Sequence, residues 1–344
     1  MQIELNRTGA LLNPDGSLAQ IGWSRQPLLD CNLDAARFYA VRPFQRLRIK
    51  RWDYYAVFSP RGFFSATIAD LGYAGNLFVY MLDFETGELH EEGVVIPFAK
   101  GVQLPRNSTE GNSRFQNEKV TIDFRVEATQ RKISVVWPEF HDGRGIQAEI
   151  TLNCPAGYES MAIVIPIGKK RFYYNRKINC LPAEGTIKNG DRIERLDPAI
   201  CSGSLDWGRG VWEYQSYWNW ASGSGYLPDG RTLGLNLGCG FGDLSKAGEN
   251  ALILRNRIQK LEQIKFDYVS GDYMKPWKFS DLEGRLDLTF TPFKERIAQT
   301  RLGIIDSEVH QMFGRYSGKA VADDGEVIWI KDFIGFAEEH HARW

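Results

Sequence analysis

The sequence predicts an all-β protein of antiparallel barrel or sandwich type with few helices. Three observations predict this class: apolar and polar residues alternate over short segments, turn signals separate those segments, and helical periodicity is nearly absent. The alternation is clearest at 120–126, 133–137, 146–152 and 286–290. Tight hairpins need the positive φ angles that Asp-Gly and Asn-Gly supply, and such dipeptides occur at 142–143, 189–190, 229–230 and 324–325. We also expect a hairpin over 250–265 and a helical turn within 29–37.

The length of the chain predicts two halves of similar size. With 344 residues, it exceeds the roughly 250–300 residues at which a single core usually stops growing. Pro182, Gly185 and Gly190 cluster near the middle, and such clusters mark linkers or turns. We therefore expect one β domain over 1–185 and a second over 186–344.

The charge and cysteine content exclude several classes of protein. The formal net charge is −1 and no segment is strongly basic, so we expect no nucleic-acid partner. The five cysteines are odd in number and form no C-x-x-C pair, which favours reduced thiols in the cytoplasm over a disulfide framework. Neither a signal peptide nor a transmembrane segment is expected. Transient contact with a membrane surface and the oligomeric state stay open.

The segment 202–220 combines many aromatic side chains with a few ionisable ones. Alternate residues of a strand point to one face, so the even-numbered residues from 212 to 220 could form one continuous aromatic wall. Such a wall is typical of a cavity for an apolar ligand, although tryptophans can equally fill a solid core. The ligand-binding residues that we expect are Trp207, Arg209, Trp212, Tyr214, Trp218, Trp220 and, near the C-terminus, Phe336.

Three acidic residues are candidate catalytic groups. Asp206 lies among Trp and Tyr residues, and loss of hydration favours the protonated form of a carboxyl, so Asp206 could deliver a proton to an alkene or a leaving oxygen. Glu338 would share a strand face with Phe336, and it is an auxiliary candidate together with Glu213. The alternative for Asp206 is an ion pair, such as one with Arg209, and the alternative for Glu338 is a solvent-facing strand end or an ion pair with an arginine.

No metal site and no cofactor are expected. His340 and His341 are adjacent, so on a strand they would face opposite sides and could not easily bind one ion. The run Gly238-Cys-Gly-Phe-Gly lacks the spacing of a dinucleotide-binding loop.

Several segments resemble the domain-of-unknown-function family 2804. They are Gly22-Trp-Ser-Arg-Gln-Pro, Leu205-Asp-Trp-Gly-Arg-Gly-Val-Trp, Trp218-Asn-Trp-Ala-Ser-Gly, Lys275-Pro-Trp-Lys-Phe, Phe313-Gly-Arg-Tyr-Ser-Gly, Ile334-Gly-Phe-Ala-Glu and Arg343-Trp. The central stretch from Tyr173 to Gly208 is more distantly similar to the AttH-like, carotenoid hydratase and tocopherol cyclase group.

This second resemblance implies two tandem lipocalin-like β domains. The group includes enzymes that protonate isoprenoid double bonds and relatives that assist pericyclic cyclisation. The resemblance would place Asp206 at or near the acidic position of the group's motif. Here Asp206 directly precedes Trp207-Gly208, whereas the group has two intervening residues.

Three functions follow as hypotheses. The first is an acid-assisted hydratase, cyclase or isomerase that acts without a cofactor on an isoprenoid- or polyketide-like molecule, with Asp206 as proton donor. The second is a protein that binds or transfers a lipid or another hydrophobic ligand without changing it. The third is a carbohydrate-binding or carbohydrate-active protein, because tryptophan platforms also stack on sugars.

Overall fold

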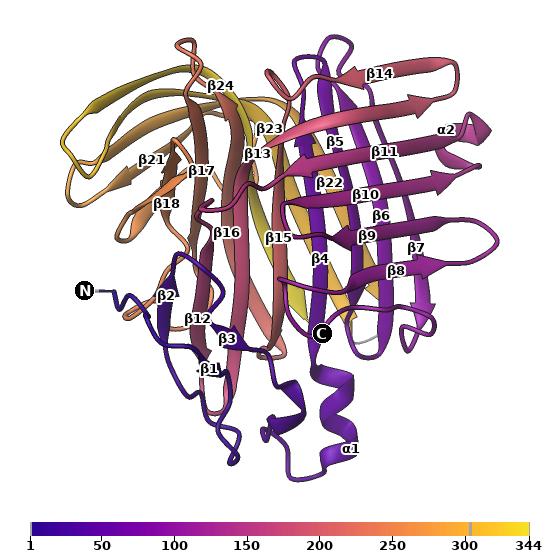
Figure 1. The fold of residues 1–344 in the computed structure, drawn as a ribbon, viewed down its shortest axis with the longest axis vertical. Helices are drawn as coiled ribbons and strands as arrows, with labels where there is room; N and C mark the ends of the chain where they lie inside the picture. Colours follow the sequence, from indigo (N-terminus) through magenta and orange to yellow (C-terminus); the bar gives the residue numbers. More distant parts are fainter. Residues whose placement is uncertain (1, 303–304, 344) are drawn as a thin grey trace.

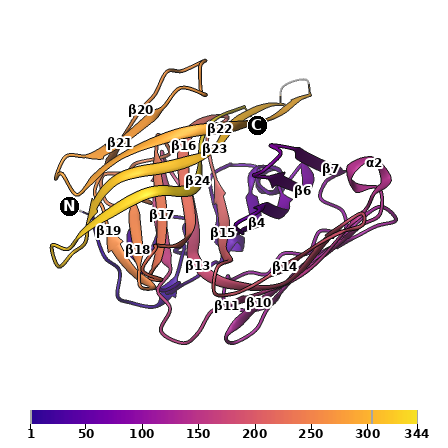
Figure 2. The same cartoon turned by 90° about the horizontal axis from the view of Figure 1, so that it is seen from above.

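The computed structural model describes residues 2–302 and 305–343, and almost all of them lie in or between the strands of two large curled antiparallel sheets. Figures 1 and 2 show the two sheets beside each other, with the second sheet formed by the C-terminal part of the chain. Each sheet curves into a half-barrel. This is the architecture of two tandem lipocalin-like units, and the predicted all-β class is confirmed.

The first sheet follows the order β7-β6-β5-β4-β15-β13-β11-β10-β9-β8, with β12 and β14 on β13 and β2 on β12. Its strands are β2 (Gly22–Ser24), β4 (Lys50–Phe58), β5 (Gly62–Asp70), β6 (Ala74–Asp83), β7 (Leu89–Pro97), β8 (Asn112–Gln116), β9 (Thr121–Val126), β10 (Gln130–Trp137), β11 (Ile146–Asn153), β12 (Met161–Ile167), β13 (Arg171–Asn189), β14 (Arg192–Leu196) and β15 (Ser202–Val211).

The second sheet follows the order β19-β18-β17-β16-β24-β23-β22-β21-β20. Its strands are β16 (Gln215–Tyr226), β17 (Thr232–Cys239), β18 (Ala251–Leu254), β19 (Arg257–Lys260), β20 (Ile264–Asp267), β21 (Trp277–Asp281), β22 (Leu286–Leu302), β23 (Ile305–Val321) and β24 (Val327–Arg343). The remaining elements are short: β1 (Gly9–Ala10) pairs with β3 (Leu29–Asp30), and the helical segments are η1 (Leu33–Ala35), α1 (Arg42–Gln45), η2 (Arg46–Arg48) and α2 (Phe140–Gly143).

The alternating segments of the sequence form the strands predicted from them. They become β9, β10, β11 and the first part of β22, each with its apolar side chains buried. The expected hairpin over 250–265 is confirmed by the pairing of β18 with β19. The expected helical turn within 29–37 is η1. Among the described residues, no helix is both long and apolar enough to cross a bilayer.

Strand β13 runs through the position where the sequence placed the domain boundary. Its first part pairs with β12 and β15, and its last part pairs with β11 and β14. The two parts meet at an irregularity where Cys180 has a φ of 64°. The chain passes from the first sheet to the second between Val211 and Gln215. The division between residues 185 and 186 therefore falls within a strand of the first sheet.

Each sheet encloses its own hydrophobic core, and two smaller clusters join the sheets. One joining cluster packs residues of β12 and β13 against Phe241, Ile253 and Ile258. The other packs aromatic residues of β4, β5 and β6 against Phe313 and Phe336. Between the sheets, next to these clusters, lies the candidate site.

Candidate functional site

A cavity of about 640 Å³ lies between the two sheets. Strands β4, β5, β6, β7, β13 and β15 line it from the first sheet, and β16, β22, β23 and β24 line it from the second. Known small-molecule sites have volumes of roughly 300–1,000 Å³. The space therefore suits an organic molecule of ordinary metabolite or drug size.

One part of the cavity has a wall of aromatic rings. The ring of Trp52 stacks on Tyr173 with centroids 5.8 Å apart and meets Trp212 edge-on at 5.3 Å. Phe241 contacts the rings of Tyr173, Trp212 and Trp218 at 5.2–5.4 Å. These rings pack against one another and still line an open space. The wall offers an apolar ligand large rigid surfaces with little loss of side-chain freedom.

Another part of the cavity holds a buried ion-pair cluster around Lys177. The Nζ atom of Lys177 lies 2.9 Å from Oδ2 of Asp206 and 3.4 Å from Oε2 of Glu249. It also lies 3.9 Å from the ring centroid of Trp220, and Asn175 donates a hydrogen bond to Asp206. Burial alone would lower the pKa of Lys177, but the two carboxylates outweigh burial and raise it. Burial raises the pKa of Glu249, and Lys177 opposes that rise.

Glu338 on β24 is a buried carboxyl without a basic partner in hydrogen-bond contact among the described residues. Its Oε1 atom accepts a hydrogen bond from the indole N–H of Trp218 at 3.3 Å, and its Oε2 atom accepts one from the amide of Gln311 at 3.1 Å. Burial raises the pKa of Glu338 to about 7, although the bond from Trp218 opposes this change. At neutral pH a substantial fraction of Glu338 is therefore protonated.

A chain of hydrogen bonds fixes the position of Glu338. The hydroxyls of Tyr54 and Tyr80 lie 3.0 Å apart, and the Tyr80 hydroxyl donates to Oε1 of Gln311. This bond directs the NH₂ group of Gln311 toward Glu338. Burial raises the pKa of both tyrosines, so both remain neutral hydroxyls. The chain joins β4 and β6 of the first sheet to β23 and β24 of the second.

Two further ionisable side chains line the cavity. Arg296 on β22 pairs with Glu91 on β7 through bonds of 2.8 and 2.5 Å and lies over the ring of Tyr80. Burial lowers the pKa of His340 to about 3, with His341 and Arg296 acting in the same direction. His340 is therefore neutral, and its Nε2 atom lies 2.9 Å from the hydroxyl of Ser307.

The structure brings five of the predicted site residues together in this cavity: Asp206, Trp212, Trp218, Trp220 and Glu338. Their side chains come from β15, β16, β24 and the link between the two sheets. In the strand register Asp206 lies opposite Lys177 and Trp220 lies opposite Glu338, while Trp218 contacts Glu338 directly.

The other predicted site residues lie outside the cavity lining. Trp207 and Arg209 project from the opposite face of β15, where Trp207 contacts Tyr174 and Arg209 pairs with Asp53. Glu213 and Tyr214 lie in the link between the sheets and are exposed, and Glu213 is 3.7 Å from Arg171. Phe336 is buried behind the ring of Trp220, at a centroid distance of 4.9 Å.

Several residues of the site are not apparent from the sequence. The most important are Lys177, Glu249, Arg296 and Gln311. Lys177 stands in a strand segment that contains both Arg176 and Asn175 and is flanked by apolar residues, and buried charges are rare unless they are paired, but the sequence alone does not show that Lys177 is buried. Glu249, Arg296 and Gln311 occur in segments of ordinary polarity, and their position follows from long-range strand pairing and, for Glu249, from the path of the segment before β18.

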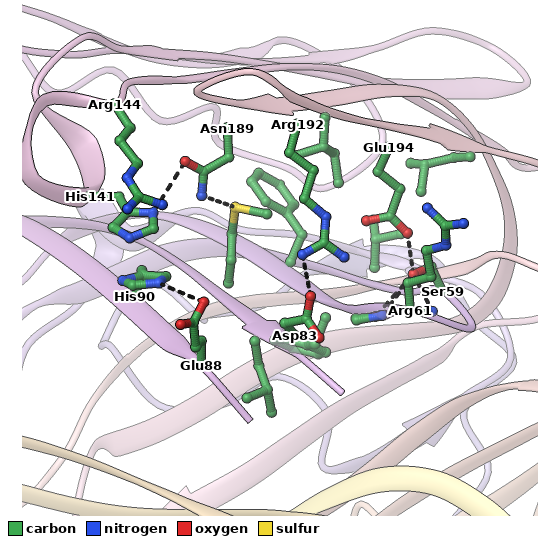
Figure 3. Close-up of a pocket in the computed structure, with 18 residues that line it drawn as sticks. Ser59, Arg61, Asp83, Glu88, His90, His141, Arg144, Asn189, Arg192 and Glu194 are labelled. Carbon is green, nitrogen blue, oxygen red and sulfur yellow. Dashed lines mark hydrogen bonds and ion pairs between the residues drawn. The ribbon is translucent and has the colours of Figure 1, made fainter. Parts of the chain in front are cut away.

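A second cavity, of about 110 Å³, lies at one end of the first sheet between β5, β6, β14 and α2 (Figure 3). In it the rings of His90 and His141 stack with centroids 3.2 Å apart, Arg192 pairs with Asp83, and Glu194 accepts a hydrogen bond from Ser59. This space is below the usual range for small-molecule sites. Among the described residues, no group of three or more His, Cys, Asp or Glu side chains is arranged to hold a metal ion.

The chain belongs to the family described as "Domain of unknown function (DUF2804)", whose model matches residues 2–344. A comparison of the sequence with curated proteins gives no match.

Solved structures share the fold at low sequence identity. Kievitone hydratase from Nectria haematococca is 13% identical, with a TM-score of 0.51 over 86% of this chain and 88% of that one. CghA in complex with Sch210972 is 10% identical, with a TM-score of 0.50 and the same coverage. An AttH-type protein from Nitrosomonas europaea is 14% identical, with a TM-score of 0.43 over 90% of this chain and 96% of that one. At these identities the likeness concerns the fold.

Proposed function

We propose that this protein is an acid-assisted enzyme of the hydratase, cyclase or isomerase type that acts on an apolar small molecule. The observation that carries the proposal is Glu338, a carboxyl with a pKa of about 7 in a cavity with an aromatic wall. A general acid works best when its pKa is near the working pH. An isoprenoid- or polyketide-like substrate fits the apolar wall, and the chemistry requires no cofactor.

In this proposal Glu338 takes the role of proton donor that the sequence suggested for Asp206. Asp206 accepts hydrogen bonds from the Lys177 ammonium and from Asn175, which are contacts of an ionised carboxylate. Among the described residues, the donors of hydrogen bonds to Glu338 are both neutral, namely Trp218 and Gln311. Asp206 instead supplies a fixed negative charge close to the reacting molecule.

The proposed reaction begins when the Glu338 carboxyl transfers its proton to one carbon of a substrate double bond, which leaves a cation on the other carbon. The π faces of Trp218 and of the aromatic wall stabilise that cation, at about 0.5–2 kcal/mol for each aromatic contact, and Asp206 adds the part of its charge that Lys177 does not neutralise. A water molecule or a substrate hydroxyl then forms a bond to the cationic carbon, and its proton returns to the Glu338 carboxylate. The sum is hydration or ring closure with the acid regenerated.

The shared fold supports this class of reaction. One of the structural neighbours is, by its name, a hydratase, and another was solved with Sch210972. A fold by itself does not define a function. The proposal therefore depends on the groups inside the cavity of this chain.

Isotope incorporation tests the proposal. Native mass spectrometry of the purified protein should reveal a co-purified apolar molecule. An organic extract of the expressing cells, incubated with the protein in D₂O, should contain a compound that gains deuterium on carbon. Glu338→Gln should abolish this incorporation and leave the affinity for the co-purified molecule within about threefold, since the amide keeps the shape of the side chain.

Glu339→Gln is the matched control. Glu339 is the neighbouring residue, it is also buried, and it points to the other face of β24, where it accepts hydrogen bonds from Tyr268 and Tyr273. This variant should retain incorporation. A protein that binds the molecule but incorporates no deuterium would be a carrier, and incorporation that persists in Glu338→Gln would remove Glu338 from the mechanism.

A further inference from the structure

We propose that the end of the molecule where the cavity opens is a docking surface for an anionic lipid membrane. This inference is independent of the chemistry in the cavity, because a carrier of apolar molecules would use the same surface.

The position of the opening follows from the exposure of residues that line the cavity. Val95 on β7 and Ile297 on β22 line the cavity and are nevertheless 61% and 57% exposed. Val95 follows Glu91 along β7 and Ile297 follows Arg296 along β22, and the ion pair between Arg296 and Glu91 joins these two strands. Leu71, in the turn between β5 and β6, lines the same end. The cavity therefore opens between β7 and β22, at the end of the molecule that carries α1 (Figure 1).

Large apolar side chains are exposed around this opening. Phe98, just after β7, is 69% exposed, and Phe44 in α1 is 60% exposed. The turn between β5 and β6 joins these positions: the N–H of Phe98 donates to the carbonyl of Tyr73, and the backbone of Arg46 packs against Gly72. Val41 and Tyr39 add further exposed apolar surface. Such clusters on a protein surface mark interaction sites.

The backbone at Phe98 has an unusual conformation. Phe98 and Ala99 have φ angles of 55° and 51°, in the left-handed region that bulky residues rarely adopt. The backbone of this turn is therefore strained, and the turn holds the phenyl ring of Phe98 in solvent. Strain of this kind is typical of functional positions.

The charge of the same segment complements an anionic surface. Residues 37–51 contain six basic residues and no acidic one. Lys50 is buried, and Arg51 is paired with Asp70, but Arg46 is exposed. Lys100, two residues after Phe98, is also exposed. Basic residues next to exposed aromatic rings are the usual composition of proteins that bind the interface of anionic bilayers.

A membrane is the binding partner that also agrees with the apolar character of the cavity behind the opening. A molecule that prefers the aromatic wall dissolves in a bilayer rather than in water. An opening that rests on the bilayer lets such a molecule enter the cavity without crossing water. Phe44 and Phe98 would insert at the level of the headgroups, and the basic side chains would contact the lipid phosphates.

Vesicle flotation tests the inference. The protein should float with vesicles of phosphatidylcholine and phosphatidylserine, bind pure phosphatidylcholine vesicles much more weakly, and dissociate as the salt concentration rises. The double variant Phe44→Ser/Phe98→Asn should lower the partition coefficient about tenfold or more. Arg46→Glu should weaken binding to the mixed vesicles alone. Thermal unfolding should show that both variants remain folded.

The double variant Leu282→Ser/Trp329→Ser is the matched control. Leu282 is 98% exposed and Trp329 is 74% exposed. Leu282 precedes β22 and Trp329 lies near the start of β24, whereas the residues of these strands that line the cavity lie toward their C-terminal ends. The control should float like the parent protein. The inference is overturned if both double variants bind equally well, or if the protein binds soluble polyglutamate but neither type of vesicle, which would indicate an acidic protein partner.

Discussion

The Nζ atom of Lys177 lies 2.9 Å from Oδ2 of Asp206, and the two residues are directly opposite each other on β13 and β15. Both side chains are at most 10% exposed. Removing two charges from water costs several kcal/mol for each ion, and their mutual attraction offsets this cost only while both are present. The pair therefore fixes the negative charge of Asp206 inside the cavity.

Removing the cation of this pair should destabilise the protein strongly. Lys177→Met leaves the acidic side chains of Asp206 and Glu249 buried without their ammonium partner, so the free energy of unfolding should fall by about 3–5 kcal/mol in urea titrations. The double variant Lys177→Met/Asp206→Asn should recover part of this loss. Lys265→Met, in the exposed pair with Asp267, should cost less than about 1 kcal/mol. Equal losses for the buried and the exposed pair would contradict this account.

Glu338 should make the stability of the protein depend on pH. Its pKa is about 7 in the folded protein and 4.5 for the free side chain. Below pH 4.5 the carboxyl is protonated in both states, so its contribution to stability is fully present. As the pH rises to about 7 the unfolded state ionises first, and stability falls by a total of about 3 kcal/mol. The difference between the parent and Glu338→Gln, measured by denaturation from pH 4 to pH 9, should show this slope, and a flat difference would disprove the raised pKa.

Trp218 should tune the acidity of Glu338. Its indole N–H donates to Glu338 and stabilises the ionised form, which lowers the pKa. Trp218→Phe should therefore raise the pKa of Glu338 further. Difference infrared spectroscopy measures this as a shift of the carboxyl band's titration midpoint to higher pH, and the band should disappear in Glu338→Gln. Trp329→Phe, at an exposed site, should leave the midpoint unchanged.

Gly208 should be required for the aromatic wall. A Cβ atom at this position would lie 2.0 Å from Cζ2 of Trp52, which lines the cavity. Gly208→Ala should displace the Trp52 ring and weaken the binding of the co-purified molecule at least tenfold, as measured by native mass spectrometry. Gly9→Ala, where the nearest atom is 3.8 Å away, should bind like the parent. Unchanged binding by Gly208→Ala would mean that Trp52 does not contact the ligand.

Local patterns of the sequence predicted the strands and several turns, because alternation and turn residues act over a few positions. Ile133, Val135 and Trp137 alternate with polar residues and all face the core of the first sheet. The transfer between the sheets was not predictable in this way. The even-numbered aromatic residues after 210 continue the alternation in the sequence, but the strand ends at Val211, so Tyr214 lies at the surface while Trp212 lines the cavity.

The chemistry of the site depends on strand register, which the sequence does not display. Asp206 was identifiable as an acid among aromatic residues, but its ammonium partner lies on another strand. Glu338 was also identifiable, but its partner Gln311 lies opposite it on another strand, β23. Which acid keeps its proton depends on these long-range partners. Residue types alone pointed to Asp206 and Glu338, but not to Lys177 and Gln311, the partners that lie on neighbouring strands.

Because the cavity has one wall from each sheet, a molecule that fills it touches both halves of the chain. Such a molecule would extend the interior that the two sheets already share in their two joining clusters. Its binding energy would then couple the unfolding of the two sheets. If the two sheets of the empty protein unfold in separate steps, those of the occupied protein should unfold in a single cooperative step.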